Sequence, residues 1–197
     1  MGFSVMPTMM SHIAIPLALK MGLQGTEMSR RLLLLAMFCS ILPDFDVVAF
    51  SMGIPYESQW GHRGFTHSFF FAGMLALFVT AFSRRLACHP MVVFGVIFLS
   101  TASHALLDAA TNGGLGCALF WPFTDERYFL PWTPIAVSPI GIKNFLSERG
   151  AVVLLSEFYW VWLPVMGSGL VMYAATVLRL RMKNVVQKAS DADAGSI

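Results

Sequence analysis

The sequence predicts an all-α protein, a polytopic integral membrane bundle with three clear spans and an N-terminal apolar helix that either spans the membrane or is re-entrant. Three observations predict this fold class. Of the 197 residues, 56% are hydrophobic and only 12% are charged, which is about half the charge of a soluble domain. The mean hydropathy is +0.67. Several apolar runs approach the roughly 20 residues that a helix needs to cross a bilayer.

The apolar segments follow one another along the chain, separated by polar or Gly- and Pro-rich connectors. The first is interrupted by proline and polar residues, and the second contains two acidic residues. The next two are typical of apolar helices, and the last contains Pro164, where we expect a kink. These segments are residues 3–19, 32–50, 68–83, 91–110 and 151–178.

Basic clusters predict the topology, because positive residues near helix ends prefer the cytoplasm. Three clusters fall on the same side of the membrane if the spans alternate. Residues 53–67 and 111–150 then face the other side, which in a bacterium is the periplasm. The three clusters are Arg30 with Arg31, Arg84 with Arg85, and Arg179, Arg181, Lys183 and Lys188.

This topology predicts a single membrane-embedded helical domain over residues 1–183 that carries the functional site. Residues 184–197 are polar and are predicted to form a disordered tail. We expect the protein in a bacterial inner membrane, with the lipid bilayer as its partner. The sequence leaves the oligomeric state open.

Charge and cysteine content exclude two other classes of protein. The net charge of +2 and the lack of a dense basic patch argue against a nucleic-acid partner. Cys39, Cys88 and Cys117 form neither a Cys-x-x-Cys motif nor a disulfide pattern. We interpret them as small buried hydrophobic residues.

Ionisable residues inside the apolar segments are the candidates for function, because such groups normally pair or line a functional cavity. At a rise of about 1.5 Å per residue, Asp44 lies roughly 20 Å, His67 roughly 27 Å and His104 roughly 21 Å above the cytoplasmic end of its helix. All three then lie in the outer half of the membrane. The same count places His12 only about 12 Å above Lys20, so its helix must be tilted or re-entrant to join the other three residues.

Local spacing allows the polar side chains to converge. His104 and Asp108 are four residues apart and share one helix face. Two acidic residues follow Pro43, where a break in the helix lets both face one centre. Two histidines flank a turn that contains glycine and can both point inward. These two pairs are Asp44 with Asp46, and His62 with His67.

Imidazole and carboxylate groups together suit zinc, iron or manganese. The number of candidate ligands exceeds the three or four of a single catalytic zinc, so it predicts two or more divalent ions. We expect zinc first, with manganese or iron as alternatives. The expected ligands are His12, Asp44, Asp46, His62, His67, His104 and Asp108.

Each candidate also has a simpler interpretation. His62 alone suits a solvated loop residue, and His104 alone suits a core histidine with its hydrogen bonds satisfied. Asp44 can cap the helix that restarts after the proline. Asp108 can pair with Arg63 without any metal. Their convergence at one depth in a membrane favours the metal site over these separate explanations.

Five motifs in a fixed order carry a resemblance to a known family. Over roughly residues 6–145 the chain resembles the YdjM family of bacterial inner-membrane proteins. The resemblance implies a metal-dependent hydrolase and leaves the substrate open. The motifs are Ser11-His12, Leu42-Pro43-Asp44-Phe45-Asp46, His62-Arg63-Gly64-Phe65-Thr66-His67-Ser68, His104-Ala105-Leu106-Leu107-Asp108 and Leu119-Phe120-Trp121-Pro122-Phe123.

The function predicted first is hydrolysis by metal-activated water. Asp44, Asp46 or Asp108 is expected to accept the proton of that water. Arg63 is expected to steady a developing anionic oxygen. A site at the outer leaflet suggests a lipid or lipid-linked substrate, with phosphoesters included, attacked on the periplasmic side.

The alternative is a non-catalytic metal-binding membrane protein, either a transporter or a sensor. A transporter needs polar residues through the full depth of the membrane. Residues 32–41 and 69–83 are nearly free of ionisable groups. This one-sided distribution favours the hydrolase.

Overall fold

The computed structural model describes residues 9–23, 27–137 and 148–194. Within these ranges the chain is helical, with two isolated β-bridges and no strand. The all-α prediction is therefore confirmed. The helices are α1 (Met9–His12), α2 (Ala14–Gly22), α3 (Arg30–Ile41), α4 (Val48–Ser51), α5 (Phe69–Thr80), α6 (Ser83–Leu86), α7 (Pro90–Ala109), α9 (Glu148–Glu157) and α10 (Leu163–Ala194), with 3₁₀ helices at Leu42–Val47 and Phe65–His67 and a π-helix at Phe158–Trp162.

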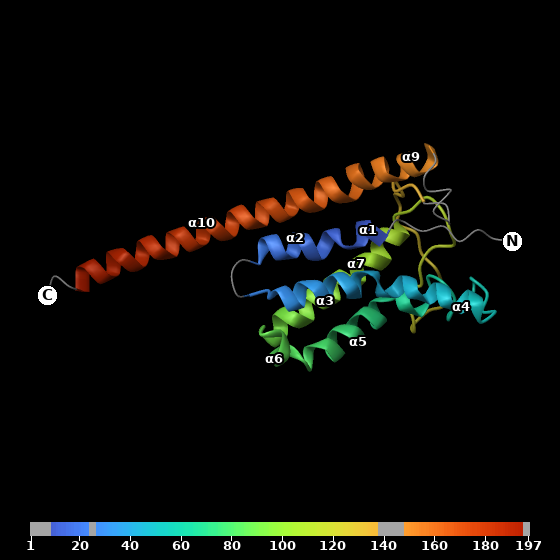
Figure 1. The fold of residues 1–197 in the computed structure, drawn as a ribbon, viewed down its shortest axis with the longest axis horizontal. Helices are drawn as coiled ribbons and strands as arrows, with labels where there is room; N and C mark the ends of the chain where they lie inside the picture. Colours follow the sequence, from blue (N-terminus) through green and yellow to red (C-terminus); the bar gives the residue numbers. More distant parts are fainter. Residues whose placement is uncertain (1–8, 24–26, 138–147, 195–197) are drawn as a thin grey trace.

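Three helical stretches are long and apolar enough to cross a membrane: Arg30–Ser51, Pro90–Ala109 and Glu148–Val185. Helix α5 is apolar but has only 12 residues. The helices run lengthwise through the molecule, and the connecting loops gather at the end where α4 and α9 lie (Figure 1). The predicted membrane bundle is confirmed by this arrangement.

Side-chain caps fix where the helices of the bundle begin. The hydroxyl of Ser29 accepts a hydrogen bond from the amide of Leu32 at the start of α3. The hydroxyl of Ser68 does the same for the amide of Phe71 at the start of α5. Both are ordinary N-cap interactions. Because Ser68 is the cap, His67 lies in the last turn before α5.

The core forms where α3, α5 and α7 pack together. Its buried residues include Leu32, Ala36, Ala76, Val93 and Ile97. The alanines let neighbouring backbones approach closely, as small residues do between membrane helices. This core lies next to the loop end of the bundle, where the polar side chains of α3, α5 and α7 and their connecting turns gather.

Helix α3 ends at Ile41, and the chain continues directly as a 3₁₀ helix. Pro43 then falls near the start of the 3₁₀ helix Leu42–Val47, where its missing N–H costs nothing. The tighter turn buries Asp44 completely, and the side chain of Asp46 is 4% exposed. The predicted break after α3 is therefore present.

The last span differs from the sequence prediction in two respects. A π-helix at Phe158–Trp162 interrupts the helix just before Pro164. Helix α10 also continues to Ala194, so most of the expected disordered tail, residues 184–194, is helical. No glycine or proline occurs in residues 184–194, so nothing ends the helix there. Residues 195–197 lie outside the described residues.

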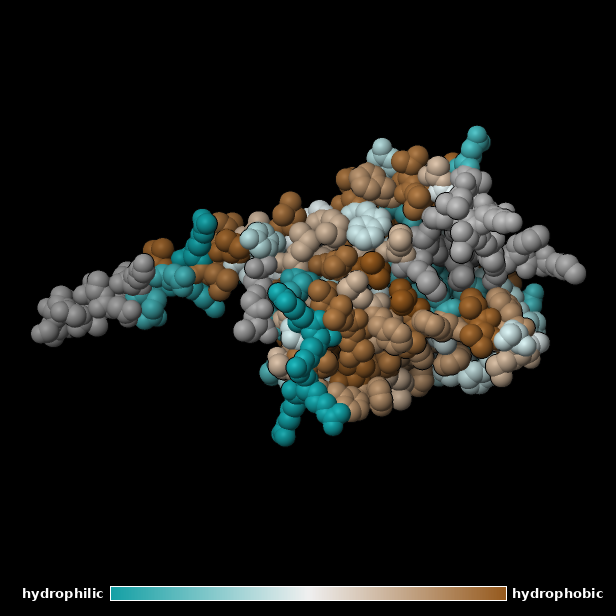
Figure 2. Space-filling model, in the orientation of Figure 1, coloured by the Kyte–Doolittle hydropathy of each residue, from teal (hydrophilic) through white to brown (hydrophobic). Residues whose placement is uncertain are grey.

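The surface divides into apolar and hydrophilic regions along the long axis of the molecule. Apolar side chains cover the visible flank of the bundle, and hydrophilic residues gather near α6 and along the part of α10 that extends beyond the bundle (Figure 2). This is the pattern expected of a protein with a lipid-facing belt. The N-terminal apolar helix expected over residues 3–19 appears as α1 and α2, and residues 1–8 lie outside the described ranges.

Candidate metal centre

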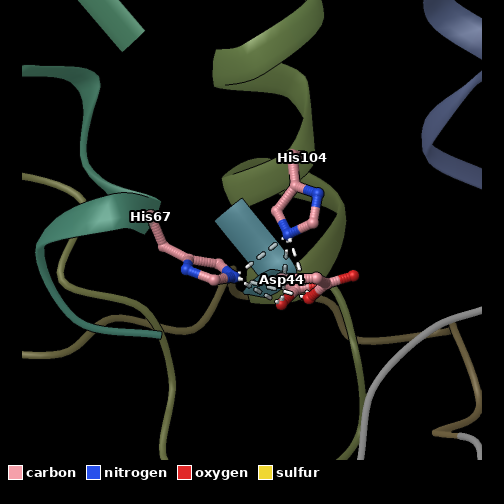
Figure 3. Close-up of side chains that lie close together, drawn as sticks. Asp44, His67 and His104 are labelled. Atoms are coloured by element: carbon pink, nitrogen blue, oxygen red, sulfur yellow. Dashed lines mark hydrogen bonds and ion pairs between the residues drawn. The ribbon is translucent and has the colours of Figure 1, made fainter. Parts of the chain in front are cut away.

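Four buried side chains converge at the loop end of the bundle. Asp44 comes from the 3₁₀ helix after α3, His67 from the turn before α5, and His104 and Asp108 from α7. Each offers one donor atom, and these atoms all lie within 4.8 Å of one another. The rings of His67 and His104 point toward the carboxylate of Asp44 (Figure 3).

The spacing of the donor atoms suits a single ion. The Nε2 atoms of His67 and His104 lie 3.0 Å apart. Asp44 Oδ1 lies 3.4 Å from His104 Nε2 and 3.9 Å from His67 Nε2. Asp108 Oδ2 lies 3.3 Å from His67 Nε2 and 4.0 Å from His104 Nε2. Ligands held about 2.0–2.2 Å from one zinc lie roughly 3–4 Å from each other, so these distances fit the donor set of one ion.

The tautomer of His104 is set by a backbone carbonyl. Its Nδ1 lies 2.7 Å from the carbonyl oxygen of Ser40 and must donate to it. The Nε2 of the neutral ring is then unprotonated, and its lone pair faces the centre. Metal-binding histidines typically donate their other ring N–H in this way.

The tautomer of His67 is set in the same manner by Asp46. The Nδ1 of His67 lies 3.2 Å from Asp46 Oδ2. That oxygen also accepts from the Thr66 hydroxyl at 2.7 Å and from the backbone N–H of Arg63 at 3.1 Å. Asp46 therefore acts as a shared acceptor that orients His67.

His62 is buried beside this acceptor and not among the four donors. Its Nδ1 lies 2.6 Å from Asp46 Oδ1. Two ligands of one ion rarely come this close, because bonds of about 2.0–2.2 Å keep them roughly 3 Å apart. The contact is therefore a hydrogen bond from His62 to Asp46. The structure brings both predicted ligands to the edge of the centre, where Asp46, His62 and His67 form a second group whose donor atoms lie within 4.8 Å of one another.

His12 reaches the centre despite its predicted lower position. Its ring stacks on His104 with centroids 3.7 Å apart, and its Nε2 lies 3.7 Å from Asp108 Oδ1. The count along the sequence assumed one helix from Lys20. The structure has two short helices, separated at Ile13, and α2 continues past Lys20 to Gly22.

Arg63 is fully buried and pairs with Asp108. Its Nε lies 2.9 Å from Asp108 Oδ2, and its Nη1 donates to the carbonyl of Gly113 at 3.0 Å and to the hydroxyl of Thr111 at 3.3 Å. This is the pairing that the sequence offered as the simpler explanation for Asp108. The pair leaves the other three donors of the centre unexplained.

Burial and charge together indicate a cation. Neither oxygen of Asp44 has a hydrogen-bond partner among the described residues. Asp44, Asp46 and Asp108 carry three negative charges against the single guanidinium of Arg63, so neutral imidazoles leave two net negative charges. A buried, uncompensated carboxylate is costly. A divalent ion offsets both charges, so the residues present fit such an ion.

The pKa of His67 shows what the centre does without a metal. Burial alone lowers that pKa, but the hydrogen bonds to Asp108 and Asp46 outweigh burial and raise it from 6.5 to about 9. The metal-free ring therefore holds a proton between two carboxylates at neutral pH. Coordination of an ion by His67 would require the loss of that proton.

Other residues shape the site without a signal in the sequence. Arg127 donates to the carbonyls of Tyr56, Ser58 and His62 at 2.8–3.0 Å and so holds the loop that carries the histidines. Nothing near Arg127 in the sequence identifies these partners, because they lie 65–71 residues away. Thr66, by contrast, lies between Arg63 and His67 in the polar block that the sequence singled out.

Comparison with known proteins gives a family and one curated relative. The family model of the YdjM inner membrane protein matches residues 6–182. The inner membrane protein YbcI of Escherichia coli (strain K12) is 40% identical over 162 residues, which cover 82% of this chain and 94% of the relative. No solved structure matches the chain.

Proposed function

The chain belongs to the YdjM family of inner membrane proteins, and we propose that it is a membrane-embedded, metal-dependent hydrolase. The observation that carries the proposal is the convergence of Asp44, His67, His104 and Asp108 in one buried group with the donor spacing of an ion. The proposed substrate is a lipid or lipid-linked molecule, with phosphoesters included.

The donor set favours zinc, with manganese or iron as alternatives, because two imidazoles and two carboxylates suit all three. A bound ion of this kind supplies Lewis acidity and lowers the pKa of water toward neutrality. The four-residue group accounts for one ion. The expectation of two or more ions stays a prediction.

The chain's own residues divide the remaining work. His67 and His104 are fixed in the required tautomers by Asp46 and by the Ser40 carbonyl. Asp44 is the proposed proton acceptor, since neither of its oxygens is engaged in a hydrogen bond with a described residue. Asp46 is less suited to that role, because its oxygens already accept several hydrogen bonds.

Arg63 is proposed to act through Asp108. Its guanidinium is committed to Asp108, Thr111 and Gly113. It therefore balances the charge of one metal-binding carboxylate and limits how far that carboxylate can turn. This differs from the direct contact with a substrate anion that the sequence suggested.

The site is proposed to face the periplasm. It lies at the end of the bundle that carries residues 53–67 and the loop after α7, whereas α6, with its two arginines, lies at the opposite end (Figure 1). Basic residues prefer the cytoplasmic side. The substrate then enters from the outer leaflet.

One observation favours the alternative of a non-catalytic metal site. His104, Asp44 and Asp108 are fully buried, and His67 is 1% exposed. Structural metal sites are closed, whereas catalytic sites keep a position open for water or substrate. Metal content and turnover therefore have to be measured separately.

The first experiment measures metal in the purified protein and in three variants, His67→Ala, His104→Ala and His89→Ala. His89 is the matched control, because it lies at the start of α7 and its ring bonds only the amide of Met91 among the contacts described. We expect stoichiometric metal in the wild type and His89→Ala, and loss of metal in the other two. A wild type without metal, or unchanged metal in all variants, contradicts the proposal.

The second experiment tests the hydrolase against the alternative. The metal-loaded protein in vesicles is assayed with ester and phosphoester lipids. Asp44→Asn is compared with the wild type at matched metal content. Turnover in the wild type and a loss of at least about 100-fold in the variant support Asp44 as proton acceptor. Bound metal without turnover on any lipid supports the non-catalytic alternative.

A further inference from the structure

A groove of about 720 Å³ is lined by residues of α1, α2 and the last span. Its walls are apolar apart from Glu157, the one ionisable residue among the described residues that line it. Glu157 itself is 1% exposed. The lining also includes Met10, Met21, Trp162, Gly167 and Leu170.

The groove runs lengthwise along the membrane helices. Helices α2 and α10 lie parallel, since Ala18 faces Gly169 and the Thr176 hydroxyl donates to the carbonyl of Gly22. The groove is lined near one end by Met10 and further along by Met21. Eleven residues separate these two methionines, which corresponds to roughly 16 Å of helix. The groove is therefore elongated in the direction of a lipid chain.

One end of the groove lies beside the metal centre. Met10 and His12 both belong to α1 and are two residues apart, so their side chains point to nearly opposite faces of the helix. Met10 is 65% exposed and lines the groove, whereas His12 is buried against His104. The groove and the centre therefore contact opposite faces of α1.

The surroundings and the lining identify one occupant. The wall formed by the last span faces outward, because Phe158, Leu163 and Leu170 are exposed and belong to a stretch long and apolar enough to cross the membrane. Water is excluded at that depth, so the groove takes an apolar, elongated molecule. We propose that it holds one hydrocarbon chain of a membrane lipid whose polar end reaches the metal centre. The role of that polar end rests on the proposed function.

Gly167 allows the groove to be filled without disturbing the protein. A Cβ added there meets no heavy atom within 4 Å, so Gly167→Phe projects into the groove. Gly73 in α5 is equally open but does not line the groove, and Gly73→Phe is the matched control. Both changes remove a glycine from an apolar helix, so their effects on helix propensity are equal.

The test uses vesicles of phosphatidylethanolamine and phosphatidylglycerol that include a phosphatidylglycerol with a photoreactive group in one chain. Adducts are mapped by peptide mass spectrometry. We expect labelling of the groove residues to exceed that of Leu77 and Leu99, lipid-facing residues of α5 and α7, by about fivefold, or roughly 1 kcal/mol of preference. Gly167→Phe removes this excess, and Gly73→Phe retains it.

Even labelling of the groove, Leu77 and Leu99 overturns the inference, because it describes ordinary surrounding lipid. Cross-links from α10 to a second copy of the chain, formed with a bifunctional reagent in the same vesicles, also overturn it, since a protein then covers the groove. Metal content and turnover of a short-chain substrate are measured on the same samples. Concentrated labelling in a protein without turnover refutes the hydrolase alone. Even labelling in an active protein refutes the lipid-chain groove alone.

Discussion

The carboxylate of Asp46 illustrates how a residue can orient a candidate metal ligand through hydrogen bonds. It accepts hydrogen bonds from His62, His67, Thr66 and the backbone of Arg63. These contacts fix the ring of His67 so that its Nε2 faces Asp108 at 3.3 Å. The orientation of one ligand therefore depends on a residue that touches it from behind.

This arrangement separates the effects of two substitutions. Asp46→Asn keeps all four donors but weakens the hold on His67, so metal affinity should fall by about 10–100-fold. Asp44→Ala removes a donor and should abolish stoichiometric binding. Competition with a metal-sensitive dye measures both. Equal affinities of Asp46→Asn and the wild type would show that Asp46 does not orient His67.

The raised pKa of His67 predicts how metal binding depends on pH. The carboxylates of Asp108 and Asp46 overcome the opposing effect of burial and raise that pKa to about 9. The metal-free ring therefore carries a proton below pH 9, and the metal must displace it. Affinity should rise about tenfold per pH unit between pH 6 and 8 and level off above pH 9.

Titration calorimetry in two buffers of different ionisation enthalpy checks this expectation, because a proton released on binding makes the observed enthalpy depend on the buffer. His89→Gln is a suitable comparison, since His89 belongs to neither group of candidate donors. An affinity that does not change with pH rules out a protonated His67 in the metal-free protein.

The sequence could predict residues whose positions follow from regular helices. Asp44, His104 and Asp108 lie on or directly after α3 and α7, so a fixed rise per residue placed them at one level, and the structure brings them together. The count placed His12 low because it began at Lys20, whereas α2 continues to Gly22. The partners of Arg127 depend on the path of a long loop, which no local pattern encodes.

At the scale of the helix, the contact between α2 and α10 depends on one glycine. A Cβ added at Gly169 lies 3.0 Å from the Cα of Ala18 and 3.1 Å from its Cβ. The backbone of α2 leaves no room for a larger side chain. Close approach at small residues is a common way for membrane helices to associate.

Gly169→Val should therefore destabilise the protein by about 1–3 kcal/mol, because overpacking pushes the two helices apart. Gly167→Val, two residues away, is the control, since its added Cβ meets nothing within 4 Å. Thermal unfolding in detergent compares the two. Equal unfolding temperatures would mean that α2 and α10 do not depend on this contact.

At the scale of the whole molecule, the centre and the basic clusters occupy opposite ends of the bundle. The sequence predicted this polarity from Arg30, Arg84 and Arg179 with their neighbours, and the fold keeps the α6 cluster away from the metal centre (Figure 1). The preference of arginine for the cytoplasm supports the proposed orientation of the bundle, with the centre toward the periplasm.

Accessibility to a membrane-impermeant maleimide tests this orientation. The background is Cys88→Ser, because Cys39 and Cys117 are buried and Cys88 is partly exposed. Glu57→Cys, in the loop of the metal centre, should react in intact cells whose outer membrane is permeable. Arg181→Cys, in α10, should react only after the inner membrane is opened. The reverse pattern would place the centre in the cytoplasm.

The shortness of α5 has a consequence for the surrounding lipid. Its 12 residues correspond to about 18 Å, whereas the hydrocarbon of a bilayer is about 30 Å thick. Such a mismatch is relieved when the bilayer thins locally. Phospholipid headgroups beside α5 then sink toward its first turn, and His67 immediately precedes the cap of that turn. The protein would thereby bring the lipid–water boundary down to the level of the candidate metal centre.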